Sequence, residues 1–103
     1  MSTKPLDTTV PDGAAGAFDP AAPYRLSESV SLRPEPFGAL VYDFVTRKLS
    51  FLKTPQLVSV VRDLENQPDA RSAVRAAGVE EPQHDAYLRA LAGLLKSRTI
   101  VAR

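Results

Sequence analysis

Apolar and polar residues alternate over the first third of the folded part of the chain, and this alternation predicts strands. Within residues 24–33, three of the four positions on one face are apolar, and the pattern is clearest at 30–33. A second strand is expected from Gly38. A third is expected over 48–53, where two apolar residues share one face and Ser50 lies on the other.

The segment that joins the second and third strands, 43–47, has no Asn-Gly or Asp-Gly pair, so a longer hairpin loop is expected. Asp43 is the turn-initiating residue, because an aspartate side chain accepts hydrogen bonds from backbone amides two residues on. Phe44 and Val45 are unusual in a turn, and the sequence pattern gives no reason for them.

Apolar residues at helical spacing predict three helices in the rest of the chain. The first covers about 55–64 and is capped by Thr54. The second is capped by Asp69 and extends to Ala77. The third begins near Pro82 and has the strongest periodicity of the three. Strands followed by helices predict an α+β fold, a three-stranded antiparallel sheet followed by a three-helix bundle. The arrangement is winged-helix-like, although the hairpin precedes the helices.

Residues 1–23 are predicted to be a disordered N-terminal tail, because they contain several prolines and their apolar content is mostly alanine. The folded domain is then 24–103. Phe18 is interpreted as an exposed aromatic in this tail, with docking into the peptide groove described below as the alternative. The tail carries a net charge of −2 and the domain a net charge of +3, which together give the overall charge of +1.

Composition limits the chemistry. The 103 residues include no cysteine and one histidine, so disulfides, thiolate catalysis and cysteine-based metal sites are excluded. No apolar run is long enough to span a membrane, and no secretory signal is present. A cytoplasmic protein without a membrane partner is expected. The net charge is too small to indicate a nucleic-acid partner by itself.

The only candidate for a catalytic residue is His84. One hypothesis makes it a general base or a metal ligand with Glu80, Glu81 or Asp85, and the competing interpretation is a solvated residue at a helix start. No catalytic residues, metal or cofactor are therefore assigned, and the chain is predicted not to be an enzyme. A binding domain is expected instead.

Two surfaces are candidates for binding. The open edge of the third strand is a template for an incoming strand, although the lysines at its two ends also serve to protect an edge from aggregation. The other surface consists of scattered cations and supports an alternative hypothesis, a winged-helix-like nucleic-acid-binding protein. These cations are Arg47, Lys48, Lys53, Arg62, Arg89, Lys96 and Arg98.

Three segments give the sequence a family resemblance. They are Arg-Pro-Glu-Pro-Phe-Gly-Ala-Leu-Val-Tyr at 33–42, Leu-Ser-Phe-Leu-Lys-Thr-Pro at 49–55 and Leu-Leu-Lys-Ser-Arg-Thr-Ile-Val at 94–101. Over about 24–103 the chain resembles the PqqD-like peptide recognition elements (RiPP recognition elements), and within them the mycofactocin-system peptide chaperones. The turn at 43–47 lacks the glycine that relatives often have there.

The resemblance implies a peptide chaperone without a cofactor. Its partners would be the leader region of a ribosomally made precursor peptide, added as a strand to the third strand, and a radical S-adenosylmethionine maturase in mycofactocin biosynthesis. The maturase would decarboxylate the C-terminal tyrosine of the peptide and crosslink it to the neighbouring valine. A monomer is expected. The implied peptide-binding residues are Lys48, Leu49, Ser50, Phe51, Leu52, Lys53, Tyr87, Leu88, Leu91 and Leu95; for Leu91, a place in the core is an equally good interpretation.

A proline at Ser50 is expected to weaken peptide binding if the N–H of that residue faces outward.

Overall fold

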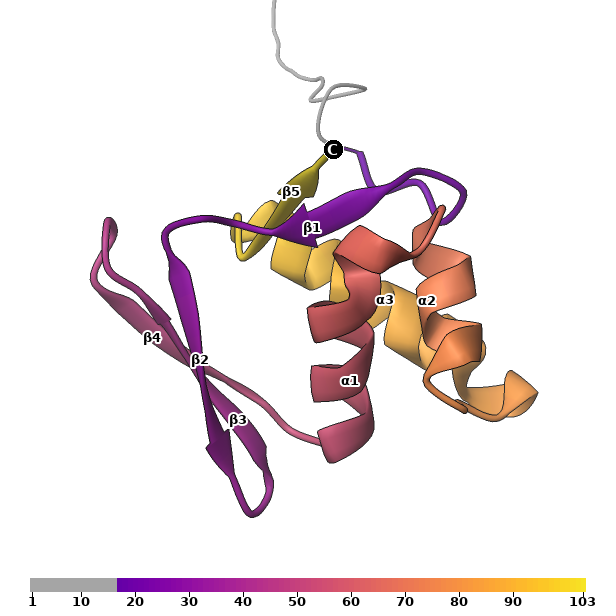
Figure 1. Ribbon diagram of the computed structural model, residues 1–103, viewed down its shortest axis with the longest axis horizontal. Coiled ribbons are helices and arrows are strands. Elements are labelled where there is room, and N and C mark those ends of the chain that lie inside the picture. Colours follow the sequence, from indigo (N-terminus) through magenta and orange to yellow (C-terminus); the bar gives the residue numbers. More distant parts are fainter. Residues whose placement is uncertain (1–16) are drawn as a thin grey trace, which may run out of the picture.

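The computed structural model describes residues 17–103 and has the predicted α+β architecture (Figure 1). A three-stranded antiparallel sheet has the order β2-β3-β4, formed by Val30–Glu35, Gly38–Asp43 and Lys48–Leu52. Three α-helices follow on one side of it. The prediction of a disordered tail falls mostly on residues 1–16, which lie outside the described residues.

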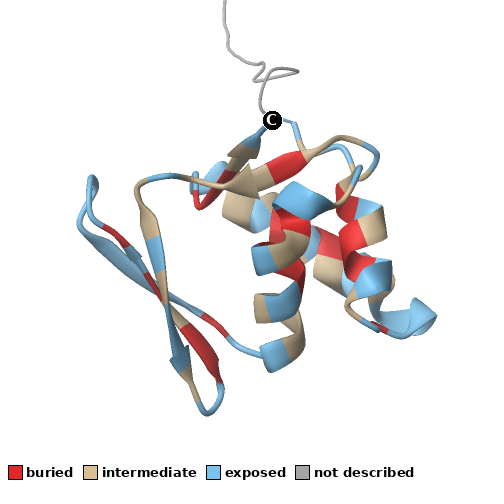
Figure 2. Ribbon diagram, in the orientation of Figure 1, coloured by how far each residue is buried: buried red, intermediate tan, exposed pale blue. Residues whose placement is uncertain are grey.

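The sheet packs one face on the helices and leaves the other uncovered. Ala39 and Val41 of β3 and Leu52 of β4 are buried on the inner face. Because side chains alternate along a strand, Leu40 and Tyr42 of β3 lie on the outer face, together with Leu49 and Phe51 of β4. Figure 2 shows the consequence, since β4 is almost wholly exposed while β3 and the helices carry buried positions.

Two strands outside this sheet were not foreseen as a pair. Tyr24–Leu26 forms β1 and pairs in antiparallel register with β5, Ile100–Ala102. The prediction that 24–33 is one strand is therefore wrong, because residues 27–29 turn the chain before β2 begins. The end of the chain completes this second, two-stranded sheet.

The β3–β4 turn is held by Asp43, as predicted. Its carboxylate accepts hydrogen bonds from the amides of Val45 at 2.9 Å and Thr46 at 3.2 Å. The Thr46 amide bond is the main reason that the pKa of the Asp43 carboxyl lies below its usual value. Arg47 takes the positive φ of 64° that a glycine often provides. These contacts hold the backbone of the turn, and the side chains of Phe44 and Val45 are exposed.

The helices form the other half of the core. The helical elements are α1 (Pro55–Asp63), η2 (Leu64–Asn66), α2 (Ala70–Ala76), η3 (Glu81–Gln83) and α3 (His84–Lys96). Thr54 caps α1 and Asp69 caps α2, each accepting a backbone amide as predicted. Side chains from α1, α2 and α3 meet in one hydrophobic cluster with the inner face of the sheet.

Residues 17–23 lie against the domain. The carbonyl of Ala22 accepts the amide of Ala70 at 3.1 Å, and the carbonyl of Pro20 accepts the amide of Arg71 at 3.0 Å. Phe18 is half-buried and stacks on Tyr24 with ring centroids 5.2 Å apart. This segment therefore contributes to the structure around β1 and α2.

Gly38 is required where β3 passes the end of β4. A Cβ built at this position would overlap the backbone carbonyl of Leu52. We expect Gly38→Ala to lower the free energy of unfolding by about 1–3 kcal/mol, as overpacking against backbone does. Urea denaturation followed by circular dichroism measures this. An unchanged midpoint would show that the two strands separate here without cost.

Candidate peptide-binding groove

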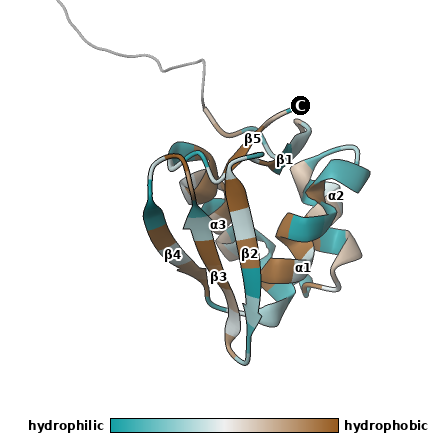
Figure 3. Ribbon diagram, turned by 60° about the vertical axis from the view of Figure 1, so that its left-hand side comes forward, coloured by the Kyte–Doolittle hydropathy of each residue, from teal (hydrophilic) through white to brown (hydrophobic). Residues whose placement is uncertain are grey.

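The strand β4 has one free edge. In the described part of the chain it pairs with β3 alone, at the end of the strand order. Figure 3 shows this edge at the side of the sheet, with α3 behind the sheet. An unpaired edge presents backbone donors and acceptors to any extended chain that can reach it.

The hydrogen-bond pattern shows which backbone groups are free. The amide of Phe44 donates to the carbonyl of Ser29 at 3.0 Å, so its N–H points toward β2. Directions alternate along an antiparallel strand, and the N–H of Val41, three residues earlier, therefore points toward β4. Val41 is in register with Ser50. The N–H and C=O of Ser50 thus belong to the β3–β4 ladder.

Leu49 and Phe51, on either side of Ser50, turn their N–H and C=O groups to the free edge. The condition set for the Ser50 proline, an outward N–H, is not met, because that N–H faces β3. A proline at Ser50 would break the internal ladder. The positions that test the edge are Leu49 and Phe51.

An apolar groove runs beside this edge, with a volume of about 420 Å³. One side comes from the end of β4 and the start of α1, and the other from one face of α3. It is lined by Phe51, Lys53, Thr54, Leu57, Ala86, Tyr87, Ala90, Gly93 and Leu94. Such a groove beside an open strand gives an added strand both ladder partners and pockets for its side chains.

The residues expected at the peptide site fall into four groups. Phe51, Lys53 and Tyr87 line the groove, and Lys48, Leu49 and Ser50 are exposed along β4. Leu95 is half-buried against the core. The remaining three belong to the hydrophobic core, where their side chains support the groove without lining it: Leu52, Leu88 and Leu91.

Apart from Tyr87, the helical wall of the groove was missed by the sequence interpretation. It consists of small residues spaced by four and three along α3, which are Ala86, Ala90 and Gly93, followed by Leu94. The predicted wall consisted of large residues at helical spacing, which are equally typical of a core. The small residues beside them are the ones that allow another chain to approach. The spacing of Ala86, Ala90 and Gly93 was the available signal.

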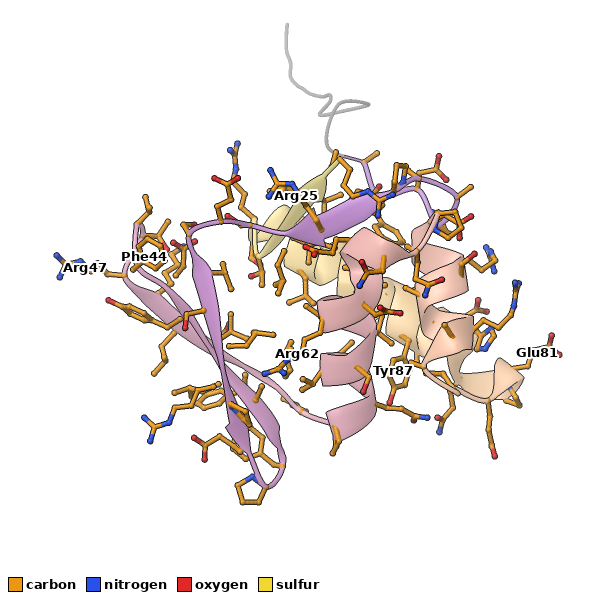
Figure 4. The ribbon with its side chains drawn as sticks, viewed as in Figure 1. Arg25, Phe44, Arg47, Arg62, Glu81 and Tyr87 are labelled. Carbon is orange, nitrogen blue, oxygen red and sulfur yellow. The ribbon has the colours of Figure 1, made fainter. Side chains whose placement is uncertain are left out.

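A hydrogen-bond network closes one end of the groove. The hydroxyl of Tyr87 lies 3.1 Å from Thr54 Oγ1 and donates to Gln56 Oε1 at 3.5 Å. Gln56 in turn donates to the carbonyl of Gly78 at 3.0 Å. Figure 4 shows Tyr87 beside the first turn of α1. The network fixes α3 relative to the junction between β4 and α1.

Removing the hydroxyl in Tyr87→Phe should lower the free energy of unfolding by about 0.5–1.5 kcal/mol, the usual net effect of a hydrogen bond. Peptide affinity should change by less than a few fold, because the ring that lines the groove remains. Chemical denaturation and a peptide titration of the same variant measure both quantities. A large loss of affinity with unchanged stability would assign the hydroxyl to peptide contact.

Electrostatics in the groove are simple. Of its lining residues, Lys53 carries a charge, and it lies at the end of β4. Arg89 and Lys96 are exposed on α3 but are not part of the lining. An acidic side chain in a bound peptide would therefore find its partner at Lys53.

The structure places His84 against the loop that precedes α3. Its Nε2 lies 2.7 Å from the carbonyl oxygen of Val79, which ties the start of α3 to the preceding loop. Within residues 17–103, no three histidine or acidic side chains gather closely enough to hold a metal ion. No described helix is long and apolar enough to cross a membrane.

Comparison with known proteins gives a consistent family. Residues 23–101 match the model of the peptide chaperone MftB family. The chain is 56% identical over 87 residues to peptide chaperone MftB of Mycobacterium ulcerans (strain Agy99), covering 84% of this chain and 80% of that one. It is 46% identical over 103 residues to peptide chaperone MftB of Mycobacterium tuberculosis (strain ATCC 25618 / H37Rv), covering 100% of this chain and 94% of that one.

A third relative, peptide chaperone MftB of Mycolicibacterium smegmatis (strain ATCC 700084 / mc(2)155), is 55% identical over 84 residues, covering 82% of each chain. No solved structure matches the chain. The relatives are named for a non-catalytic role, in agreement with the prediction that the chain is not an enzyme. With the family model matched from the start of β1 to β5 and these identities over most of its length, the chain belongs to the peptide chaperone MftB family.

Proposed function

We propose that the chain binds the leader region of a ribosomally made precursor peptide as a fourth strand on β4. The observation that carries this proposal is the free edge of β4 beside an apolar groove. The outward N–H and C=O groups of Leu49 and Phe51 would pair with the peptide backbone. These four groups give affinity for any extended chain and leave selectivity to the side chains.

The groove defines the peptide that fits. In an added strand, every second side chain points toward α3, where the wall of small residues leaves room for a large apolar group. An acidic side chain near the end of β4 would meet Lys53, contributing under about 1 kcal/mol at an exposed site. The expected leader segment is therefore extended, apolar at alternate positions and acidic at one end.

The proposed partner is a radical S-adenosylmethionine maturase in mycofactocin biosynthesis, to which the chain would present its peptide. The chain would hold no cofactor and act as a monomer. Its contribution would be effective concentration, because a tethered leader keeps the rest of the peptide near the enzyme. The family name supports a role of this kind.

Titration of the chain with a labelled leader peptide, followed by fluorescence anisotropy, tests the proposal. Saturable binding is expected, together with little binding of a scrambled peptide of the same composition. Equal binding of both peptides, or of neither, would refute the assignment of leader recognition.

The alternative of a winged-helix-like nucleic-acid-binding protein makes a different prediction. It requires duplex DNA to bind with an affinity that falls steeply as salt rises. The groove lining is apolar apart from a few polar groups and carries one cation, which favours a peptide over a phosphate backbone. The same anisotropy assay with a DNA duplex at two salt concentrations separates the two hypotheses.

A further inference from the structure

The outer face of the sheet carries a group of exposed aromatic and aliphatic side chains. We call it the outer sheet face, and its most exposed aromatic and aliphatic members are Phe37, Tyr42, Leu49 and Phe51, which are 43%, 38%, 56% and 54% exposed. Tyr42 is in register with Leu49, and the rings of Phe37 and Phe51 meet edge to face at 5.8 Å. A contiguous exposed patch of this kind marks an interaction surface more often than chance.

The outer sheet face is continuous with the proposed peptide strand. Phe51 belongs to both, since it lies on this face and also lines the groove. If a peptide adds to β4, half of its side chains point toward α3 and the other half emerge beside Leu49 and Phe51. The bound peptide would therefore widen the outer sheet face by one strand. A partner that covers this face would contact chaperone and peptide together.

The charges around the outer sheet face restrict which kind of protein can bind it. Arg33 lies on the outer face of β2, where it is paired with Glu35 at 3.5 Å, and Arg47 projects from the turn at the far end of the sheet (Figure 4). Lys53 lies at the other end of β4. Glu35 already pairs with Arg33, and a second copy would offer only the same cations at the ends of its own β4. The occupant expected here is therefore a different protein with an apolar patch and an acidic group opposite Arg47.

We propose that the outer sheet face, extended by the bound peptide strand, is the docking surface for the enzyme that modifies the peptide. This inference rests on the function proposed above. Aromatic and arginine side chains are the residue types that contribute most at protein interfaces. Because the docking surface is partly made of peptide, the loaded chaperone binds the enzyme more tightly than the free one, and by reciprocity the enzyme tightens peptide binding.

The test measures two affinities on the same proteins, using the leader peptide and the radical S-adenosylmethionine enzyme as probes. Tyr42→Ser should leave leader affinity within about twofold, because Tyr42 is on the central strand and lines no groove, while enzyme affinity falls at least about fivefold. Tyr42→Phe should retain enzyme binding. In the parent chain, saturating leader peptide should tighten enzyme binding at least about fivefold.

Retained leader binding by Tyr42→Ser also reports that the variant is folded. Unchanged enzyme affinity in a Tyr42→Ser chain that still binds leader would overturn the docking surface and leave the proposed function intact. Equal enzyme affinity for free and loaded parent chain would overturn the shared surface. If the parent chain does not bind leader at all, the proposed function fails, and the docking inference fails with it.

Discussion

Leu49→Pro is expected to weaken leader binding about ten- to hundredfold while the domain stays folded. The N–H of Leu49 faces the free edge of β4, so proline removes a donor that only the peptide uses. One lost hydrogen bond corresponds to about tenfold in affinity, and the proline ring also hinders the close approach of a neighbouring strand. Fluorescence anisotropy with labelled leader peptide measures the loss.

Two control variants make this result specific. Leu49→Ala removes the same exposed side chain but keeps the N–H, so leader affinity should stay within about threefold of the parent. Ser50→Pro removes a donor of the β3–β4 ladder, and this variant should lose stability in urea, not only affinity. Equal leader affinity in Leu49→Pro and Leu49→Ala would contradict pairing at this position.

The second large effect is expected at Gly93. No atom lies within 4 Å of a Cβ built there, and the position lines the groove, so a side chain would project into the space proposed for the peptide. Gly93→Leu should therefore weaken leader binding at least about tenfold. The same substitution should raise the free energy of unfolding by about 0.5–1 kcal/mol, because glycine is a poor helix former.

Gly93→Ala is the matched control. Alanine brings the same gain in helix propensity with much less volume, so stability should rise similarly while leader affinity falls far less than with leucine. Urea denaturation and leader titration of the two variants provide both comparisons. If both variants are more stable and both bind leader like the parent, the peptide does not occupy the groove beside Gly93.

The elements that depend on local sequence were predictable. Helix starts at Thr54 and Asp69 follow from capping chemistry, and the third strand of the sheet follows from alternation around Ser50. The turn at Asp43 was recognised as well. The exposed Phe44 and Val45 were not explained, because their position depends on Arg47 adopting a positive φ, which residue type does not predict.

Long-range strand pairing and the direction of backbone hydrogen bonds could not be predicted from the sequence. Tyr24–Leu26 looks continuous with β2, yet its partner is the strand at Ile100–Ala102, more than seventy residues away. The direction of the Ser50 N–H depends on the register across three strands, so no local pattern reveals it. Likewise, Leu88 and Leu91 have the periodicity of either a core or a groove wall, and only packing separates the two.

Amide hydrogen exchange along β4, with and without leader peptide, tests the central claim most directly. In the free chain, the Ser50 amide should be protected by the β3–β4 ladder, while the amides of Leu49 and Phe51 exchange quickly. Saturating leader peptide should protect Leu49 and Phe51 and leave Ser50 as it was. Rapid exchange at both Leu49 and Phe51 in a peptide-saturated sample would contradict strand addition to β4.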